Sequence, residues 1–150
     1  MTTKQTIDTF LNLQNIAVVG VSQNPKKFGT LCYHFLREND YNVIPVNNKL
    51  SEFDDRKCYP NLTSIPEKID GALLVVPGEQ TEKVVEEAKS LGINYIWMQT
   101  GAETKKAIEF CENNNINVVH NECIFMFAEP VKGAHKFHRV IKKIFRKLPA

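Results

Sequence analysis

Residues 15–29 read NIAVVGVSQNPKKFG, and this stretch decides the fold. It opens with an uninterrupted apolar run at residues 16–19, which is typical of a parallel strand buried on both faces. Gly20 and the turn-forming residues Ser22 and Asn24 then predict a tight loop. Because apolar side chains at helical spacing follow, the loop should deliver its amides to a helix N-terminus, which attracts phosphate. The alternative is a plain strand-turn-helix corner with solvated lysines.

The same alternation of strand and helix recurs along the chain. Apolar runs predict further strands at residues 41–46, 70–76, 94–99 and 116–119, and helical periodicity predicts helices at residues 3–13, 30–39, 79–91 and 103–114. Connections of these lengths imply parallel strands with right-handed crossovers. The predicted fold is therefore α/β, an open doubly wound parallel sheet of about five strands with flanking helices.

Two segments are expected to pack around this sheet without extending it. Residues 51–69 carry two prolines and are predicted as a crossover connection with at most one short helical turn. Its buried contacts should come from Tyr59, Leu62 and Ile65. The helix at residues 3–13 is amphipathic and is expected to pack against the edge of the sheet.

The composition indicates one domain over residues 1–150, because 150 residues with 43% hydrophobic content suffice for a single core. No apolar run approaches the length of a membrane span and the amino-terminal residues lack signal-peptide features, so a cytoplasmic location is expected. The four cysteines are widely spaced without a C-x-x-C pair, which favours reduced thiols. No metal site is predicted.

The net charge of +2 hides an uneven distribution. Residues 1–131 carry 12 Lys and Arg against 17 Asp and Glu, whereas residues 132–150 carry seven basic residues and no acidic one. Residues 132–148 are predicted as a basic amphipathic helix that docks on the domain or on the second subunit of a homodimer. The alternative partners are an acidic surface, an anionic membrane or nucleic acid, of which nucleic acid is not favoured.

The loops that follow the predicted strands should meet at one edge of the sheet. Parallel strands bring residues 20–29, 47–49, 77–78, 99–101 and 121–123 to the carboxyl edge. Ligands of open α/β sheets bind at this edge, where the strand order reverses. The convergence of these loops predicts a ligand site.

The residues after the second predicted strand bear on which nucleotide binds. An acidic residue there would grip the ribose hydroxyls of NAD, but the sequence has Asn47, Asn48 and Lys49. The first loop also departs from G-x-G-x-x-G, because Ser22 and Pro25 occupy the second and third glycine positions. A nucleotide with a ribose phosphate, NADP or coenzyme A, is therefore favoured over NAD.

Six separate segments, in order, carry a resemblance to a known family. They are IAVVGVSQNPKKFG at residues 16–29, YNVIPVNNK at 41–49, RKCYPNL at 56–62, SIPEKIDGALLVVP at 64–77, INYIWMQTG at 93–101 and VVHNECIFMF at 118–127. In this pattern the chain resembles the small single-domain CoA-binding proteins, which are similar to the N-terminal CoA-binding domain of the succinyl-CoA synthetase alpha subunit. The resemblance implies a Rossmann-like fold that holds coenzyme A or an acyl-CoA along its carboxyl edge.

The resemblance also implies which residues bind the cofactor. In the first loop, phosphates and the backbone turn would be held by Gly20, Val21, Ser22, Lys26, Phe28 and Gly29. Val46 and Asn47 would flank the adenosine, with Lys49 a partner for the ribose phosphate. Further along, Val76 and Pro77 would line the adenine or pyrophosphate side, and the floor would consist of Gln99, Thr100 and Gly101. Asn121 stands where the most similar subgroup has glycine, and asparagine tolerates the positive φ of such a turn.

Cys123 is the candidate for covalent chemistry. It would lie at the carboxyl edge, where a thiolate could meet the thiol of coenzyme A as a mixed disulfide. The alternative is a small buried apolar residue. The sequence contains no nucleophile elbow, paired-carboxylate spacing or P-loop, so no catalytic residue is predicted and a binding protein is favoured over an enzyme. The alternatives are an NADP-dependent oxidoreductase and a CoA-sensing regulatory or interaction module.

Overall fold

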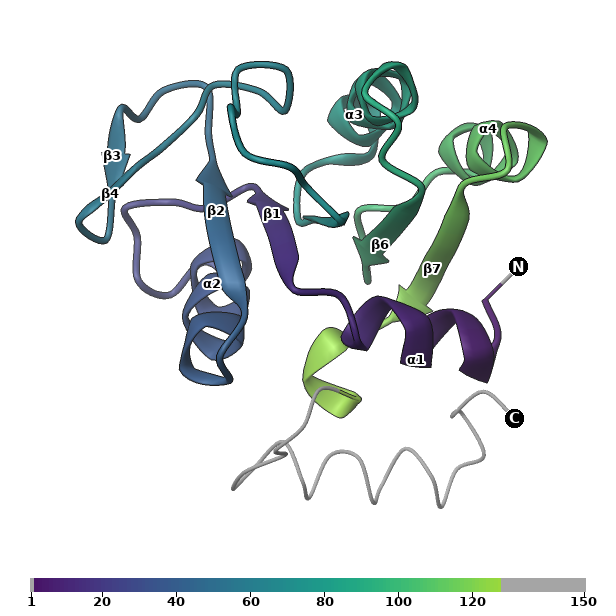
Figure 1. Ribbon diagram of the computed structural model, residues 1–150, viewed down its shortest axis with the longest axis horizontal. Helices are drawn as coiled ribbons and strands as arrows, with labels where there is room; N and C mark the ends of the chain where they lie inside the picture. The colour runs from purple at the N-terminus through teal and green to yellow at the C-terminus, as the bar shows by residue number, and fades with distance from the viewer. Residues whose placement is uncertain (1, 128–150) are drawn as a thin grey trace.

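Five parallel strands form the centre of the computed structural model, which describes residues 2–127 (Figure 1). They are β1 (Asn15–Val19), β2 (Asn42–Val46), β5 (Gly71–Leu74), β6 (Tyr95–Gln99) and β7 (Asn117–Glu122). Their order across the sheet is β2-β1-β5-β6-β7. The chain moves outward from β1 to β2 and then returns to β5 on the other side of β1, so the strand order reverses between β1 and β5. The predicted fold class is confirmed.

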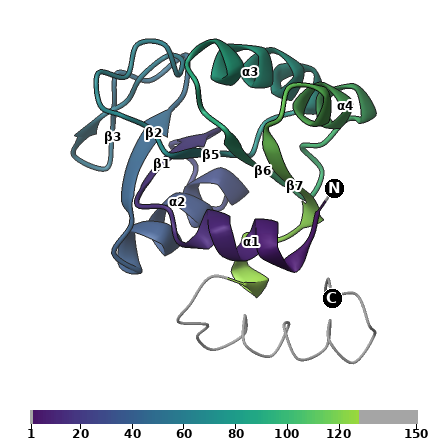
Figure 2. The same cartoon turned by 45° about the vertical axis from the view of Figure 1, so that its right-hand side comes forward.

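Helices cover both faces of this sheet (Figures 1 and 2). One face is covered by α1 (Lys4–Leu11), α2 (Phe28–Glu38) and the 3₁₀ helix η1 (Ile124–Met126), and the other by α3 (Gly78–Ser90) and α4 (Lys105–Asn113). Strand side chains alternate between two buried clusters. In β1, for example, Ile16 and Val18 join the cluster under α2, whereas Ala17 and Val19 join the cluster under α3.

The first helix lies on a face of the sheet beside one edge. The ring of Phe10 packs edge-on against Trp97 of β6 at a centroid distance of 5.4 Å, and Phe10 is 1% exposed. The expectation of an edge position therefore holds only in part, because α1 covers β6 and the edge strand β7.

The connection after β2 contains a small hairpin that the sequence does not predict. β3 (Glu52–Phe53) pairs antiparallel with β4 (Arg56–Lys57). The turn consists of Asp54 and Asp55, whose φ angles of 51° and 59° are left-handed. Aspartate tolerates this conformation, which two-residue hairpin turns require. No helix forms in this connection, and the Ile65 N–H donates to the Leu62 carbonyl at 3.1 Å in a single turn, which agrees with the prediction of at most one short helical turn. Tyr59, Leu62 and Ile65 are buried as predicted.

The last strand is longer than predicted. β7 runs to Glu122, and Asn121 has a φ of 59° at a register shift between β6 and β7. This positive φ is the conformation expected for an asparagine in place of glycine. The predicted basic helix at residues 132–148 lies outside the described residues. Among the described helices, none is both long and apolar enough to cross a bilayer.

Candidate functional site

The carboxyl ends of β1 and β5 come very close together where the strand order reverses. Gly20 follows β1 with a φ of 118° and donates its N–H to the Val46 carbonyl at 3.0 Å. A Cβ built on Gly20 would lie 2.3 Å from the carbonyl oxygen of Val75, which follows β5. Only glycine fits between these loops with this backbone conformation, so Gly20 sets the base of the crevice.

The amino end of α2 is fixed to the same loop. The Thr30 hydroxyl donates to the Ser22 carbonyl at 2.6 Å and accepts from the Ser22 N–H at 3.1 Å. Within the loop, the Asn24 N–H donates to Ser22 Oγ and the Lys26 N–H donates to Asn24 Oδ1. The loop between β1 and α2 is thus shaped by its own side chains.

The helices beside the crevice differ from the other two at their amino ends. Thr3 caps α1 and Thr104 caps α4 through their side chains. The cap positions of α2 and α3 are Lys27 and Pro77, and neither makes a side-chain capping hydrogen bond within the described structure. α2 and α3 therefore begin without a side-chain cap, and the dipole of each helix favours an anion at its amino end.

A cavity of about 450 Å³ opens beside Gly20 on the α3 face of the sheet. Four of the predicted site residues line it, and they are Gly20, Val46, Asn47 and Val76. The other nine lining residues do not belong to the predicted site: Val19 at the end of β1, Asn48 after β2, Pro60, Asn61 and Leu62 from the connection to β5, and Gln80, Lys83, Val84 and Glu87 from α3. The cavity thus combines apolar walls with amides and one charge of each sign.

Asn47 joins the two loops at this cavity. Its Nδ2 donates to the Val21 carbonyl at 2.6 Å, and its Oδ1 accepts from the Lys49 N–H at 2.7 Å. The side chain of Asn47 therefore holds the loop after β2 against the loop after β1. Lys49 has an exposed side chain and does not line the cavity.

Gln99, a predicted floor residue, is buried and positions η1. Its Oε1 accepts from the Ile124 N–H at 3.1 Å, and its Nε2 donates to Cys123 Sγ at 3.0 Å. Because an N–H can only donate, the oxygen of Gln99 must face Ile124 and the amide nitrogen must face the sulfur. Gln99 is 1% exposed, so its amide group holds the start of η1 in place and is not presented to solvent.

The remaining predicted residues divide between the first loop and the ends of later strands. The side chain of Val21 is buried in the cluster under α2, whereas Lys26 is exposed. Thr100 and Gly101 are exposed after β6. Phe28 is 43% exposed at the start of α2, and its ring packs against Phe125 of η1 at 5.3 Å. The segment after Cys123 therefore reaches the amino end of α2.

The cysteines have different surroundings. Burial raises the pKa of the Cys32 thiol, and the nearby Cys123 raises it further. Burial also raises the pKa of Cys58, and it is the main cause that raises the pKa of Cys111 to about 12. Cys123 is partly exposed. Of the four cysteines, Cys123 is thus the one that is not buried.

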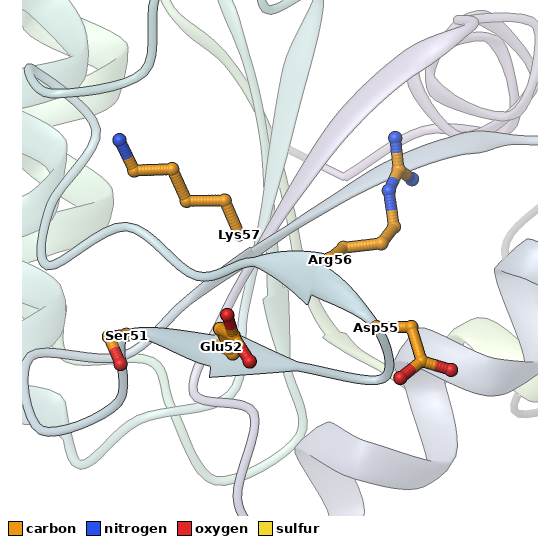
Figure 3. A pocket seen from close by; sticks show the side chains of 5 residues that line it. All are labelled: Ser51, Glu52, Asp55, Arg56 and Lys57. Atoms are coloured by element: carbon orange, nitrogen blue, oxygen red, sulfur yellow. The ribbon is translucent and has the colours of Figure 1, made fainter.

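A second hollow lies over the hairpin (Figure 3). It is lined by Ser51, Glu52, Asp55, Arg56 and Lys57, none of which belongs to the predicted site. In Figure 3 the side chains of Arg56 and Lys57 point away from each other. The guanidinium group of Arg56 donates a hydrogen bond from Nη1 to the Val43 carbonyl oxygen at 2.6 Å. The hollow therefore lacks the convergent polar groups of a ligand site.

Some of the unpredicted cavity residues could have been predicted from a sequence pattern, and others could not. Gln80, Lys83 and Glu87 have helical spacing on α3, which begins at the carboxyl edge, so they could have been predicted from the helix face. Residues 60–62 return to the cavity after the hairpin, and Glu87 Oε1 accepts from the Leu62 N–H at 2.6 Å. No sequence pattern marks that contact.

Comparisons with known proteins identify the family of this chain. A family model described as a CoA binding domain matches residues 14–129. The alpha subunit of an ADP-forming acetate–CoA ligase II from Pyrococcus furiosus is 27% identical over 148 residues, which is 91% of this chain and 32% of that subunit. The uncharacterized protein YneT of Bacillus subtilis is 27% identical over 111 residues, covering 74% of this chain and 82% of YneT. The chain thus spans about a third of the ligase subunit's length.

Solved structures show the same fold. A hypothetical protein from Pyrococcus horikoshii OT3 superposes with a TM-score of 0.78 and 32% identity, covering 82% of this chain and 87% of that one. A dinucleotide forming acetyl-coenzyme A synthetase 1 from Ca. Korarchaeum cryptofilum gives a TM-score of 0.65 and 25% identity, covering 75% of this chain and 27% of that one. By its sequence and its fold, the chain belongs to the family of CoA binding domains.

Proposed function

We propose that this protein binds coenzyme A, or an acyl-CoA, across the carboxyl edge of its sheet. The observation that carries the proposal is the cavity of about 450 Å³ beside Gly20, at the point where the strand order reverses. Open α/β sheets bind nucleotides at this point. Membership of the CoA binding domain family selects coenzyme A among the nucleotides with a ribose phosphate.

The adenosine would occupy the cavity. Val46, Leu62 and Val84 supply apolar walls suited to a flat ring, and Asn61 supplies an amide. Asn47 would act indirectly, since its side chain is engaged in joining two loops.

The pyrophosphate would lie at the amino end of α2, beyond Gly20. The helix dipole, the absence of a side-chain cap and the exposed Lys26 favour an anion there. The pantetheine arm would then continue along Phe28 toward Cys123, because η1 meets the start of α2 through Phe125.

The proposal is limited to binding. The ligase II alpha subunit from Pyrococcus furiosus is about three times longer than its matched segment, so its reaction is not assigned to this chain. The described residues support binding of a ligand at the carboxyl edge of the sheet. The two alternative functions are an NADP-dependent oxidoreductase and a CoA sensor, and the ligands compared below bear on them as well.

The experiment compares thermal shifts with coenzyme A, acetyl-CoA, dephospho-CoA and NADPH. We expect coenzyme A to raise the melting temperature, and NADPH to have no comparable effect. Val84→Phe should fill the cavity and remove the shift, whereas the control Val84→Ile should keep it, because the smaller change leaves room for the ring. A shift with NADPH alone, or a full shift in Val84→Phe, would reject the proposal.

A further inference from the structure

The charges of the cavity come from one face of α3. Gln80, Lys83 and Glu87 are spaced by three and four residues, so they share a helix face, and all three line the cavity. Lys83 is the one cation among the described lining residues, and Glu87 is the one anion. The face therefore presents an amide, an ammonium group and a carboxylate to whatever occupies the cavity.

Three other charged groups of α3 have protein partners. Glu87 Oε1 accepts the Leu62 N–H at 2.6 Å, so this carboxylate is directed at the cavity wall. Glu82 pairs with Lys106 at 3.2 Å, and Lys89 donates to the side-chain oxygen of Asn114, which caps the carboxyl end of α4. Within residues 2–127, Lys83 shows neither an ion pair nor a hydrogen bond from its ammonium group, so the group is available to a ligand.

The lysine expected from the sequence to meet the ribose phosphate does not line the cavity. Lys49 follows the loop after β2, and its backbone N–H is bonded to Asn47. Its side chain is exposed, and in this part of the chain the cavity is lined by Val46, Asn47 and Asn48. The cavity's cation instead comes from α3.

We propose that Lys83 is the residue that recognises the ribose phosphate of the bound nucleotide, and this inference rests on the proposed function. Lys83 lies one residue from Val84, whose side chain forms part of the apolar wall expected beside the adenine. A ribose phosphate lies next to its base, so a lysine beside the ring wall is within reach of it. The class of ligand that this arrangement selects is a nucleotide whose adenosine carries a phosphate on the ribose.

The test measures the affinities of the wild-type protein and Lys83→Gln for coenzyme A and dephospho-CoA by titration calorimetry. The two ligands differ only in the ribose phosphate. In Lys83→Gln the affinity for coenzyme A should fall about fivefold, as expected for an exposed charge pair, while the affinity for dephospho-CoA stays unchanged. Because Lys83 is exposed, the variant should fold normally, which circular dichroism will check.

Two further variants make the test decisive. Lys89→Gln removes a lysine from the same helix outside the cavity and should leave both affinities unchanged. Lys49→Gln examines the other candidate. Equal losses for both ligands in Lys83→Gln, no loss, or a selective loss in Lys49→Gln alone would overturn the inference. If the wild-type protein binds neither ligand, the proposed function itself fails, and this outcome is distinct from the other three.

Discussion

Gly29, in the first turn of α2, lies directly against Gly20, which follows β1. A Cβ built on Gly29 would lie 2.1 Å from the carbonyl oxygen of Gly20, and the obstructing atom is backbone, which cannot rotate away. The two glycines therefore let the amino end of α2 approach the crevice. If this approach positions the amides of α2 for a phosphate, a methyl group at residue 29 should disturb stability and binding together.

We expect Gly29→Ala to lower the free energy of unfolding by about 1–3 kcal/mol, because overpacking displaces α2 or the loop. Its affinity for coenzyme A should also fall. Urea denaturation and calorimetry measure the two effects. The control is Gly92→Asn, since Gly92 has open space and a φ of 73° that asparagine tolerates. If Gly29→Ala bound coenzyme A with wild-type affinity, the close approach of α2 to Gly20 would not be needed for binding.

Lys26 is expected to contribute positive charge to the pyrophosphate site. Lys26→Glu should weaken binding of coenzyme A, and the remaining binding should depend less on salt concentration, because one attractive charge has been reversed. Calorimetry at two ionic strengths measures both effects. Lys68→Glu is the matched control, since Lys68 is also exposed but precedes the amino end of β5, at the opposite edge of the sheet. Equal effects of the two substitutions would indicate only a change in net charge.

The cysteines should react with iodoacetamide in a defined order. Cys123 is partly exposed and should be alkylated first, whereas Cys32, Cys58 and Cys111 are buried thiols with raised pKa values and should react only on unfolding. If the pantetheine arm ends near Cys123, coenzyme A should slow its alkylation. Peptide mass spectrometry identifies the modified residue. Unchanged alkylation of Cys123 at saturating coenzyme A would place the arm elsewhere.

Glu82 should give the stability an acid-sensitive component. Hydrogen bonds from Lys106 and Thr104 lower the pKa of Glu82 from its ordinary value of 4.5. Since the folded state holds the proton less tightly, this contribution is present above about pH 4.5 and is lost as the pH falls through the lowered pKa. Unfolding free energies of wild type and Glu82→Gln across this range should converge toward low pH. A constant difference between them would contradict this explanation.

The order of elements follows from the sequence because buried parallel strands are continuous apolar runs. Residues 16–19 and 71–74 both satisfy this pattern, and the structure places both in the sheet. The hairpin around Asp54 and Asp55 could not be predicted, because neither of its two-residue strands is long enough to show an alternation.

The candidate site was predictable only in part. Gly20 and Asn47 follow strands directly, so their arrival at one edge follows from the parallel topology. The burial of Gln99 was not predictable, because it depends on where η1 returns after β7. The same reason explains Leu62, whose place at the cavity depends on a hydrogen bond to Glu87 across 25 residues of chain.

The most direct test of the account is titration calorimetry of the full chain with coenzyme A, with NADPH as the comparison ligand. We predict saturable binding of coenzyme A, lost when Val84→Phe fills the cavity beside Gly20, and no saturable binding of NADPH. Absence of heat with coenzyme A and acetyl-CoA alike would contradict the central claim, and so would unchanged binding in Val84→Phe.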